Sequence, residues 1–296
     1  MQEDGVPGSR EDAAREDVIV RPLGPKAEYE AVQEVMGATW GYEEGDIVPV
    51  PTLIATGTAG GLVHGAFRDD RLLGFSYAFP GFMEGEVLLY SQMTAVRPEV
   101  RGEGIGSRLK RFQRTWALEK GYRRIRWTFD PLMAPNARFN LRYLGAAGIR
   151  YFVDFYGISE SPLHGGLPTD RFLADWDLGS ERVRALARGE EVPFLDPLAP
   201  RLPGLYPLEG HPGGVAVPGE AELPDPREVP FLLAPIPERF LDLIREAPDA
   251  AALWRSRTRE AFRSALEAGY RFVDLVRPPS ESGARPRSHY LLAAEV

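Results

Sequence analysis

The spacing of apolar and polar residues predicts an alternating order of strands and helices over the first 178 residues. Strands are expected where apolar side chains alternate with polar ones, or form short continuous runs bounded by turn residues. Such segments occur at 18–23, 62–67, 72–79, 87–96, 124–129, 151–156 and 171–177. Because the sequence of residues 68–71 is Arg-Asp-Asp-Arg, the second and third of these strands are expected to form a hairpin.

Helices are predicted where apolar residues recur at intervals of three and four positions. The clearest helix starts at Ile105, continues through Leu109, Phe112 and Trp116, and ends at Gly121. The other helical segments in this part of the chain are 25–36, 51–58 and 136–144. Strands and helices interleaved in this order indicate an α/β fold with a mixed sheet.

The character of the chain changes after Gly179. Prolines are frequent between residues 192 and 237, which is typical of irregular, partly extended chain. Regular elements are predicted at 180–188, 229–235, 250–268, 270–276 and 289–293, of which the first and third are helical. We therefore expect a disordered polar tail over 1–17, an N-terminal domain over 18–178, and a smaller C-terminal α/β domain over 179–296 with a proline-rich entry.

One short segment occurs in both parts of the chain. Ala-Leu-Glu-Lys-Gly-Tyr-Arg at 117–123 is repeated as Ala-Leu-Glu-Ala-Gly-Tyr-Arg at 265–271, and each copy ends a predicted helix and precedes a predicted strand. We hypothesise that the C-terminal part is a degenerate copy of the first fold. The alternative is that helix, glycine cap and strand recur by chance in α/β proteins.

Composition narrows the classes of function. The chain has 296 residues and a net charge of −8, which argues against a general nucleic-acid binder. It has no cysteine, so disulfides, thiolate metal sites and cysteine nucleophiles are excluded, and its four scattered histidines do not suggest a metal site. The apolar runs are too short to span a bilayer, and the polar start is unlike a secretory signal. We therefore expect a cytoplasmic protein with no nucleic-acid or membrane partner.

Three glycines at alternate positions, Gly102, Gly104 and Gly106, follow the strand that ends at Val96. Pro98 ends that strand, because proline cannot donate a hydrogen bond to a sheet. A loop of this kind turns several backbone N–H groups toward one point, and the first turn of the next helix adds its own unpaired N–H groups and its positive dipole end. The pattern predicts an anion site suited to a diphosphate, where a Cβ would block close approach of the ligand.

Two common nucleotide-binding loops do not fit this stretch. The dinucleotide loop needs its third glycine at position 107, which is Ser107, and the triphosphate loop needs a Gly-Lys-Ser/Thr sequence that this stretch lacks. The remaining pattern, Arg101-x-x-Gly104-x-Gly106 after an apolar strand, resembles the coenzyme A pyrophosphate loop of the GNAT superfamily of N-acyltransferases. The predicted element order from about Val18 to Leu178 is similar to that of the GNAT fold.

The resemblance implies a coenzyme A site. The loop would hold the pyrophosphate. The strand before it, which splays beyond a bulge in this family, would pair with the pantetheine arm, and one of its N–H groups would polarise the thioester carbonyl. The implied cofactor-binding residues are Thr94, Ala95, Val96, Arg101, Gly102, Glu103, Gly104, Ile105, Gly106, Ser107 and Asn136. Acetyl-CoA is the expected co-substrate, and no metal is implied.

A second family pattern, Asn-x6-Tyr followed by Gly and an aromatic residue, is partly present. Asn136 and Tyr143 keep the spacing, but Gly148 comes one residue late and Ile149 replaces the aromatic residue. The resemblance implies that Asn136 contacts the cofactor and that Tyr143 protonates the departing thiolate. A phenol suits that role because it stays neutral near neutral pH and can donate a proton. The alternative is a half-buried tyrosine that only fixes its helix.

The base and the acceptor site are less constrained. Family members often use a glutamate near the start of the strand before the loop, which points to Glu86, or only a chain of waters. His64 is another candidate, although a lone strand histidine is more often structural. The acceptor would be recognised by Trp40, Tyr42 and Phe82, each of which could equally be a core or rim residue.

The resemblance therefore implies an acyl-CoA-dependent N-acyltransferase, in which the amine of a small molecule or amino acid attacks the bound thioester directly. One alternative, suggested by two-part bacterial relatives, is transfer of a succinyl group from succinyl-CoA to an amino acid. Two others are a coenzyme A-binding protein without turnover, whose second half binds a partner, and a purely structural protein. Because family members often dimerise through the closing strands, a homodimer is also expected.

Overall fold

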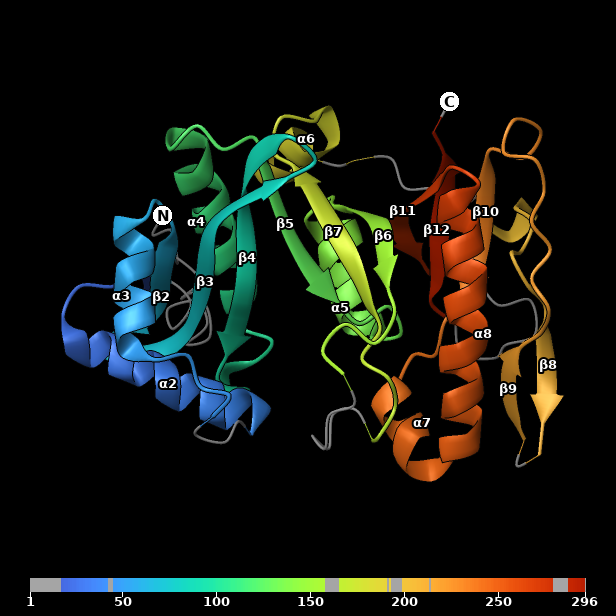
Figure 1. The fold of residues 1–296 in the computed structure, drawn as a ribbon, viewed down its shortest axis with the longest axis horizontal. Helices are drawn as coiled ribbons and strands as arrows, with labels where there is room; N and C mark the ends of the chain where they lie inside the picture. The colour runs from blue at the N-terminus through green and yellow to red at the C-terminus, as the bar shows by residue number, and fades with distance from the viewer. Residues whose placement is uncertain are drawn as a thin grey trace, which may run out of the picture. The chain divides into compact units, whose positions relative to one another are not determined.

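The computed structural model describes residues 17–41, 45–157, 165–190, 192, 199–212, 214–278 and 287–295. The chain forms two compact units, Met1–Ile125 and Arg126–Val296 (Figure 1). In the described residues, no helix combines the length and the apolar character that crossing a bilayer requires.

The first unit is built on an antiparallel sheet with the strand order β1-β2-β3-β4, in which each strand pairs with the next one along the chain. A two-residue turn joins β3 to β4, and its residues Glu84 and Gly85 have φ angles of 56° and 84°, as a tight hairpin turn requires. The strands are β1 (Val18–Pro22), β2 (Leu62–Arg68), β3 (Arg71–Met83) and β4 (Glu86–Val96).

Apolar residues on the two faces of this sheet form separate cores. Helices α2 and α3 bury Met36 and Leu53 in the cluster that contains Phe75 of β3. Helix α4 buries Ile105 and Leu109 in a second cluster with Leu73. The helices are α2 (Lys26–Trp40), α3 (Val50–Thr58) and α4 (Ile105–Glu119), and a single 3-10 turn, η1 (Pro98–Val100), follows β4.

The second unit contains a sheet with the strand order β5-β7-β6-β11-β12-β10. The C-terminal region continues this sheet, because β11 pairs with β6 at Phe272 and Gly148, and β12 and β10 follow. The strands are β5 (Arg124–Phe129), β6 (Ala147–Phe152), β7 (Arg171–Asp177), β10 (Phe231–Pro235), β11 (Tyr270–Val276) and β12 (His289–Ala294), and β8 (Leu208–His211) and β9 (Val215–Pro218) form a separate hairpin.

Stacked and edge-on aromatic rings form the core of this unit. Phe172 of β7 lies 4.5 Å from Phe272 of β11 and 5.5 Å from Phe262 of α8, measured between ring centroids. Strands from both sides of position 178 therefore share one core. The helical segments are α5 (Ala134–Ala137), η2 (Arg138–Tyr143), α6 (Glu181–Arg188), η3 (Ala199–Arg201), α7 (Phe240–Glu246) and α8 (Pro248–Glu267).

The prediction of a mixed α/β fold extended by a C-terminal α/β region is confirmed. The boundary predicted between residues 178 and 179 stays a prediction, while the compact units divide between Ile125 and Arg126. Gly121 and Gly269 in the repeated segment have φ angles of 86° and 100°, so both helices end with a left-handed glycine before a strand. That the C-terminal part is a degenerate copy also stays a prediction.

Several predicted boundaries are wrong. The strand expected at 151–156 lies at Ala147–Phe152, because Asp154 has a φ of 46° and cannot continue it. The helix expected to end at residue 36 continues to Trp40, where Gly41 in the left-handed conformation ends it. The segment expected to be irregular between 192 and 237 contains the β8–β9 hairpin.

Candidate functional site

The glycine loop between η1 and α4 has the conformation that its sequence predicts. Gly102 and Gly104 have φ angles of 91° and 79°, a region that residues with a Cβ rarely adopt. A Cβ built on either residue would meet no atom within 4 Å in the described chain, so the backbone conformation rather than crowding requires glycine. Gly104 is also the residue that caps the start of α4.

The amides of this loop are open. Among the described residues, no hydrogen-bond acceptor is recorded for the N–H groups of residues 102–107, and the first N–H of α4 that is paired to the preceding loop is that of Arg108, with Gly104 O at 3.1 Å. These N–H groups surround the positive end of the α4 dipole. The arrangement therefore fits an anionic group such as a diphosphate.

Two ion pairs and a hydrogen bond connect the loop region to the sheet. Arg68 of β2 contacts Glu103 at 2.6 Å, and Arg71 of β3 contacts Glu99 at the same distance. Between these pairs, Arg97 donates from Nε to the Leu72 carbonyl at 2.8 Å. The carboxylate of Glu103 is thus held by a guanidinium rather than directed at the anion site, while Arg101 is exposed.

Strand β4 carries the bulge that the resemblance implies. Tyr77 of β3 is opposite Met93, but the next residue, Ala78, is opposite Ser91, so Gln92 is an extra residue in β4. Beyond this bulge, the predicted thioester-binding residues Thr94, Ala95 and Val96 continue toward the glycine loop, paired with β3 at Ser76, Phe75 and Gly74.

In the second unit, the predicted Asn136 and Tyr143 lie on one short helical segment. Asn136 is exposed in α5, and Tyr143 ends η2, so the helix predicted over 136–144 is present but has π-helical geometry from Arg138 to Tyr143. Single π-helical turns are rare and frequently occur at functional sites. Tyr143 is 56% exposed, and Arg138 donates a hydrogen bond from Nε to its phenolic oxygen at 3.2 Å. Sequence reasoning did not single out Arg138.

The predicted base and acceptor residues have different surroundings. Glu86 lies at the start of β4, next to the hairpin turn, and its exposed carboxylate is 3.4 Å from Nε of Arg124. Phe82 is 72% exposed at the far end of β3, opposite Val87. Trp40 packs edge-on against Phe75 at 6.3 Å, so part of its ring belongs to the core. Tyr42 lies outside the described residues.

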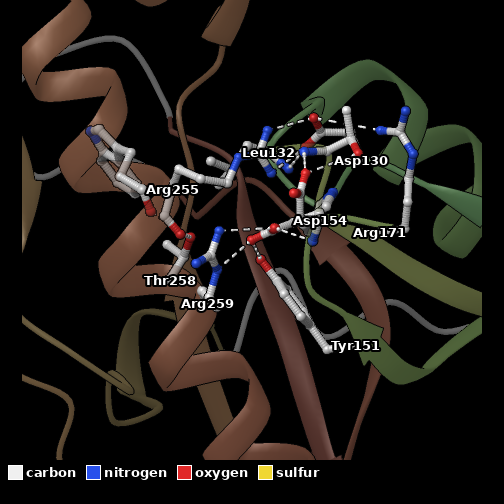
Figure 2. A network of polar contacts seen from close by, with 12 residues as sticks. Asp130, Leu132, Tyr151, Asp154, Arg171, Arg255, Thr258 and Arg259 are labelled. Carbon is white, nitrogen blue, oxygen red and sulfur yellow. Dashed lines mark hydrogen bonds and ion pairs between the residues drawn. The ribbon is translucent and has the colours of Figure 1, made fainter. Parts of the chain in front are cut away.

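Two buried aspartates connect α8 of the C-terminal region to the ends of the central strands of the second unit (Figure 2). Asp130, which follows β5, receives two hydrogen bonds from Arg255 at 2.9 and 2.6 Å. Asp170, which precedes β7, receives two from Arg259 at 2.8 and 3.0 Å. In Figure 2 both arginines come from one helix, and Arg259 points toward the segment that carries Tyr151 and Asp154.

This network orders the segments around it. Tyr151 donates to Asp170 at 2.7 Å, and the Asp154 amide donates to the same carboxylate at 3.0 Å. Burial on its own raises the pKa of Asp130, but the charge and hydrogen bonds of Arg255, together with Arg171, bring that pKa below its ordinary value. The C-terminal helix thereby supplies Arg255, the cation that favours the ionised form of the buried Asp130, and Arg259, which pairs with Asp170.

Sequence reasoning also missed a polar interior in the first unit. Lys110 and Gln113 of α4 are buried against the sheet together with His64, Ser76 and Ser91. Burial lowers the pKa of Lys110 to about 7 and that of His64 to about 4. The sequence does contain a sign that Gln113 is buried. Gln113 is at the four-residue spacing of Ile105, Leu109 and Ala117, all of which are buried.

The described residues contain no group of three or more histidine, aspartate or glutamate side chains arranged to hold a metal ion. The predicted ligand-binding residues lie in the glycine loop and strand β4 of the first unit, and in the Asn136–Tyr143 segment of the second.

A mixed α/β fold with a bulged strand, a glycine loop and a helix N-terminus defines a class of acyltransferases that bind coenzyme A. The family is given by the sequence itself, because residues 29–146 match the profile of the acetyltransferase (GNAT) family. The N-terminal part of this chain is thus a GNAT acetyltransferase domain, a domain of an enzyme family.

Several solved structures are similar to this chain over about half its length. The yncA protein of Salmonella typhimurium, solved with its cofactor acetyl-CoA, shares 16% identity over 56% of this chain and 96% of its own, with a TM-score of 0.45. A GNAT family acetyltransferase from Elizabethkingia anophelis with acetyl-CoA bound shares 15% identity over 54% and 98%, with a TM-score of 0.43. Aminoglycoside 6'-acetyltransferase type Ii shares 16% identity over 55% and 99%, with a TM-score of 0.44. No curated protein sequence matches this chain.

Proposed function

We propose that this protein is an acetyl-CoA-dependent N-acetyltransferase that acts on the amine of a small molecule or amino acid. The observation that carries the proposal is the row of open amides at residues 102–107, shaped by Gly102 and Gly104 at the start of α4, within a domain that matches the GNAT profile. Such a row fits the diphosphate of coenzyme A and leaves the bulged strand β4 beside it for the thioester arm.

Each proposed residue has one task. The amides of 102–107 bind the diphosphate, Asn136 contacts the cofactor, and an N–H of Thr94–Val96 polarises the thioester carbonyl. The amine nitrogen attacks the carbonyl carbon while Glu86 accepts the proton from that nitrogen through a chain of waters, because Glu86 and Thr94 lie at different ends of β4. The carbon–sulfur bond then breaks, and Tyr143 donates its phenolic proton to the sulfur. Catalysis needs no acyl-enzyme, so no nucleophilic side chain is required.

Glu86 is the proposed base, and its exposed carboxylate is paired with Arg124 at 3.4 Å. We expect Glu86→Gln to lower kcat. If Glu86→Gln leaves kcat unchanged, the proton leaves through water alone. Trp40, Tyr42 and Phe82 remain the proposed acceptor residues.

A homodimer also remains part of the proposal. The closing strand β6 is already paired with β11, and Leu233 of β10 is bridged by Gly204. A dimer through the closing strands would have to displace the C-terminal region. Light scattering on the purified chain measures the oligomeric state.

The proposed activity is tested by measuring thiol release from acetyl-CoA and succinyl-CoA with a panel of amines and amino acids. Acetyl-dependent release with at least one amine is expected. Release from succinyl-CoA alone identifies an amino acid N-succinyltransferase instead. Calorimetric binding of acetyl-CoA without turnover, and with no effect of Tyr143→Phe, indicates a coenzyme A-binding protein. No binding at all overturns the proposal.

A further inference from the structure

A network of five hydrogen bonds connects α4 to both sides of the bulge in β4, on one side directly through Ser91 and on the other through Ser76 of β3. Lys110 donates from Nζ to Ser91 Oγ at 2.9 Å and to Gln113 Oε1 at 3.0 Å. Gln113 donates from Nε2 to Ser91 Oγ at 3.1 Å and to Ser76 Oγ at 3.2 Å. Ser76 is in turn 2.9 Å from Thr94 Oγ1. We call Lys110, Gln113, Ser91 and Ser76 the bulge clamp.

The clamp surrounds the extra residue of β4. Ser91 comes directly before Gln92, and Met93 and Thr94 come directly after it. Ser76 Oγ donates to the Met93 carbonyl at 3.2 Å, so side-chain bonds hold the strand where the regular ladder is interrupted. All four members of the clamp are buried, which makes their mutual hydrogen bonds strong and their geometry specific.

Apolar side chains at these four buried positions would avoid the free-energy cost of burying polar groups. Taking a hydroxyl, an amide and an ammonium group out of water costs free energy unless each is hydrogen-bonded. The cost is greatest for the charged ammonium group of a lysine. Consistent with this, burial lowers the pKa of Lys110 to about 7. His64, the titratable neighbour of Lys110 within this unit, is also buried, and the Lys110 charge lowers its pKa further. The clamp therefore fixes a geometry rather than adding stability.

The bulge clamp connects two parts of the proposed ligand site, the amide row at residues 102–107 and strand β4. Helix α4 begins at Ile105 inside the amide row, and Lys110 and Gln113 follow on the same helix. Thr94, Ala95 and Val96 are the residues of β4 proposed to pair with the pantetheine arm. A helix is stiff along its axis, so bonds from α4 to β4 set the position of the amide row relative to that strand.

We propose that Lys110, Gln113, Ser91 and Ser76 are positioning residues, which hold the β4 bulge and the start of α4 in the register that lets one acyl-CoA molecule contact both. The inference rests on the proposed function, since it assumes that the amide row binds the diphosphate and β4 binds the thioester arm. It makes a distinct claim, because none of the four residues needs to touch the ligand.

The test measures binding of the nucleotide half of the ligand separately from binding of the whole ligand. Gln113→Leu and Lys110→Met replace clamp residues by apolar side chains of similar size, and Lys120→Met is the matched control because Lys120 is exposed just after the same helix. For each variant we would measure by calorimetry the Kd of 3′-phosphoadenosine 5′-diphosphate, which is the nucleotide half of coenzyme A, and the Kd of acetyl-CoA. Steady-state rates would give kcat and the KM for acetyl-CoA.

In the clamp variants, we expect the nucleotide Kd to stay unchanged, the Kd and KM for acetyl-CoA to rise about tenfold, and kcat to fall. Lys120→Met should match the wild-type chain in all four values. Equal weakening of both ligands would mean general loosening and would overturn the proposal, as would unchanged acetyl-CoA binding in a folded variant.

If Gln113→Leu or Lys110→Met fails to fold, the same measurements are made on Ser76→Ala, which removes only one hydroxyl group. If the wild-type chain shows no turnover at all, the proposed function fails. The clamp is then tested by the Kd of the nucleotide divided by the Kd of acetyl-CoA. This ratio must still be lower in the clamp variants than in the wild-type chain.

Discussion

Arg138 donates a hydrogen bond to Tyr143, which follows it by five residues, with 3.2 Å between Nε and the phenolic oxygen. The guanidinium carbon also lies 5.6 Å from the centre of the phenol ring. Both residues belong to η2, and the wider turn of a π-helix brings residues five apart onto one side. Because the guanidinium is a fixed positive charge, it stabilises the negative charge that remains on the phenol oxygen after a proton leaves.

This contact predicts that Arg138 acts only through Tyr143. Tyr143→Phe should lower kcat by about a hundredfold, the usual contribution of a general acid, with acetyl-CoA affinity intact. Arg138→Met should lower kcat by less. In the double variant, Arg138→Met should add nothing to the loss already caused by Tyr143→Phe. Steady-state kinetics of the four proteins give the coupling, and independent, additive losses would contradict this role.

The glycine loop leads to a second prediction, about Gly104. Alanine at a φ of 79° is strained by about 1–2 kcal/mol, and its methyl group would stand in the amide row. We expect Gly104→Ala to weaken acetyl-CoA binding by about tenfold, equivalent to about 1.4 kcal/mol.

Gly85 provides the control for that variant. It has a φ of 84° in the β3–β4 turn, and a Cβ there also meets nothing within 4 Å. Gly85→Ala should therefore lower the melting temperature about as much as Gly104→Ala without changing the Kd of acetyl-CoA. Equal loss of affinity in both would show that backbone strain, and not the amide row, is responsible.

The glycine loop could be predicted because its information is local. Pro98, the alternating glycines and the helix from Ile105 follow one another, and each has a conformational preference that its neighbours support. The clamp could not be predicted in the same way. Lys110 and Gln113 are polar, which favours a solvent-facing position, and the apolar spacing instead predicts that Phe112 and Trp116 face inward. In the structure both Phe112 and Trp116 are only half-buried.

Long-range partners account for most of what the sequence did not predict. Asp130 and Arg255 are 125 positions apart, and no local pattern relates them. The end of β6 at Phe152 depends likewise on Asp154, whose left-handed backbone is held by hydrogen bonds with Thr169 and Asp170. The π-helical turn at Tyr143 could not be predicted either, because the apolar spacing of this segment is compatible with an ordinary α-helix.

The Asp130–Arg255 pair leads to a prediction about the C-terminal region. Arg255→Met leaves a buried carboxylate without its main cation, and breaking such a pair destabilises a protein by about 3–5 kcal/mol. Chemical denaturation should detect this loss. Arg227→Met is the control, since Arg227 pairs with Asp225 on the surface, and it should leave unfolding unchanged. A small effect of Arg255→Met would mean that Arg171 alone compensates Asp130.

The same pair predicts acid sensitivity. The pKa of Asp130 is below its ordinary value in the folded chain, so the unfolded chain takes up a proton first as pH falls. The stability that Asp130 contributes is therefore complete above about pH 4 and is lost as pH falls further. The free energy of unfolding of the wild-type chain should decrease in this range more steeply than that of an Asp130→Asn, Arg255→Met double variant. Parallel curves would show that Asp130 titrates normally.

Lys110 should also make the free energy of unfolding rise with pH, in this case between neutral and alkaline pH. Burial lowers its pKa to about 7 in the folded chain, whereas an unfolded lysine titrates near 10.4. Between these values the unfolded chain binds the extra proton, so the free energy of unfolding should rise with pH by up to about 1.4 kcal/mol per pH unit. Subtracting the same curve for Lys110→Met removes the contribution of other groups, and His64 stays neutral throughout this range. A flat difference between pH 7 and pH 10 would mean that Lys110 keeps its proton inside the clamp, bound as a cation.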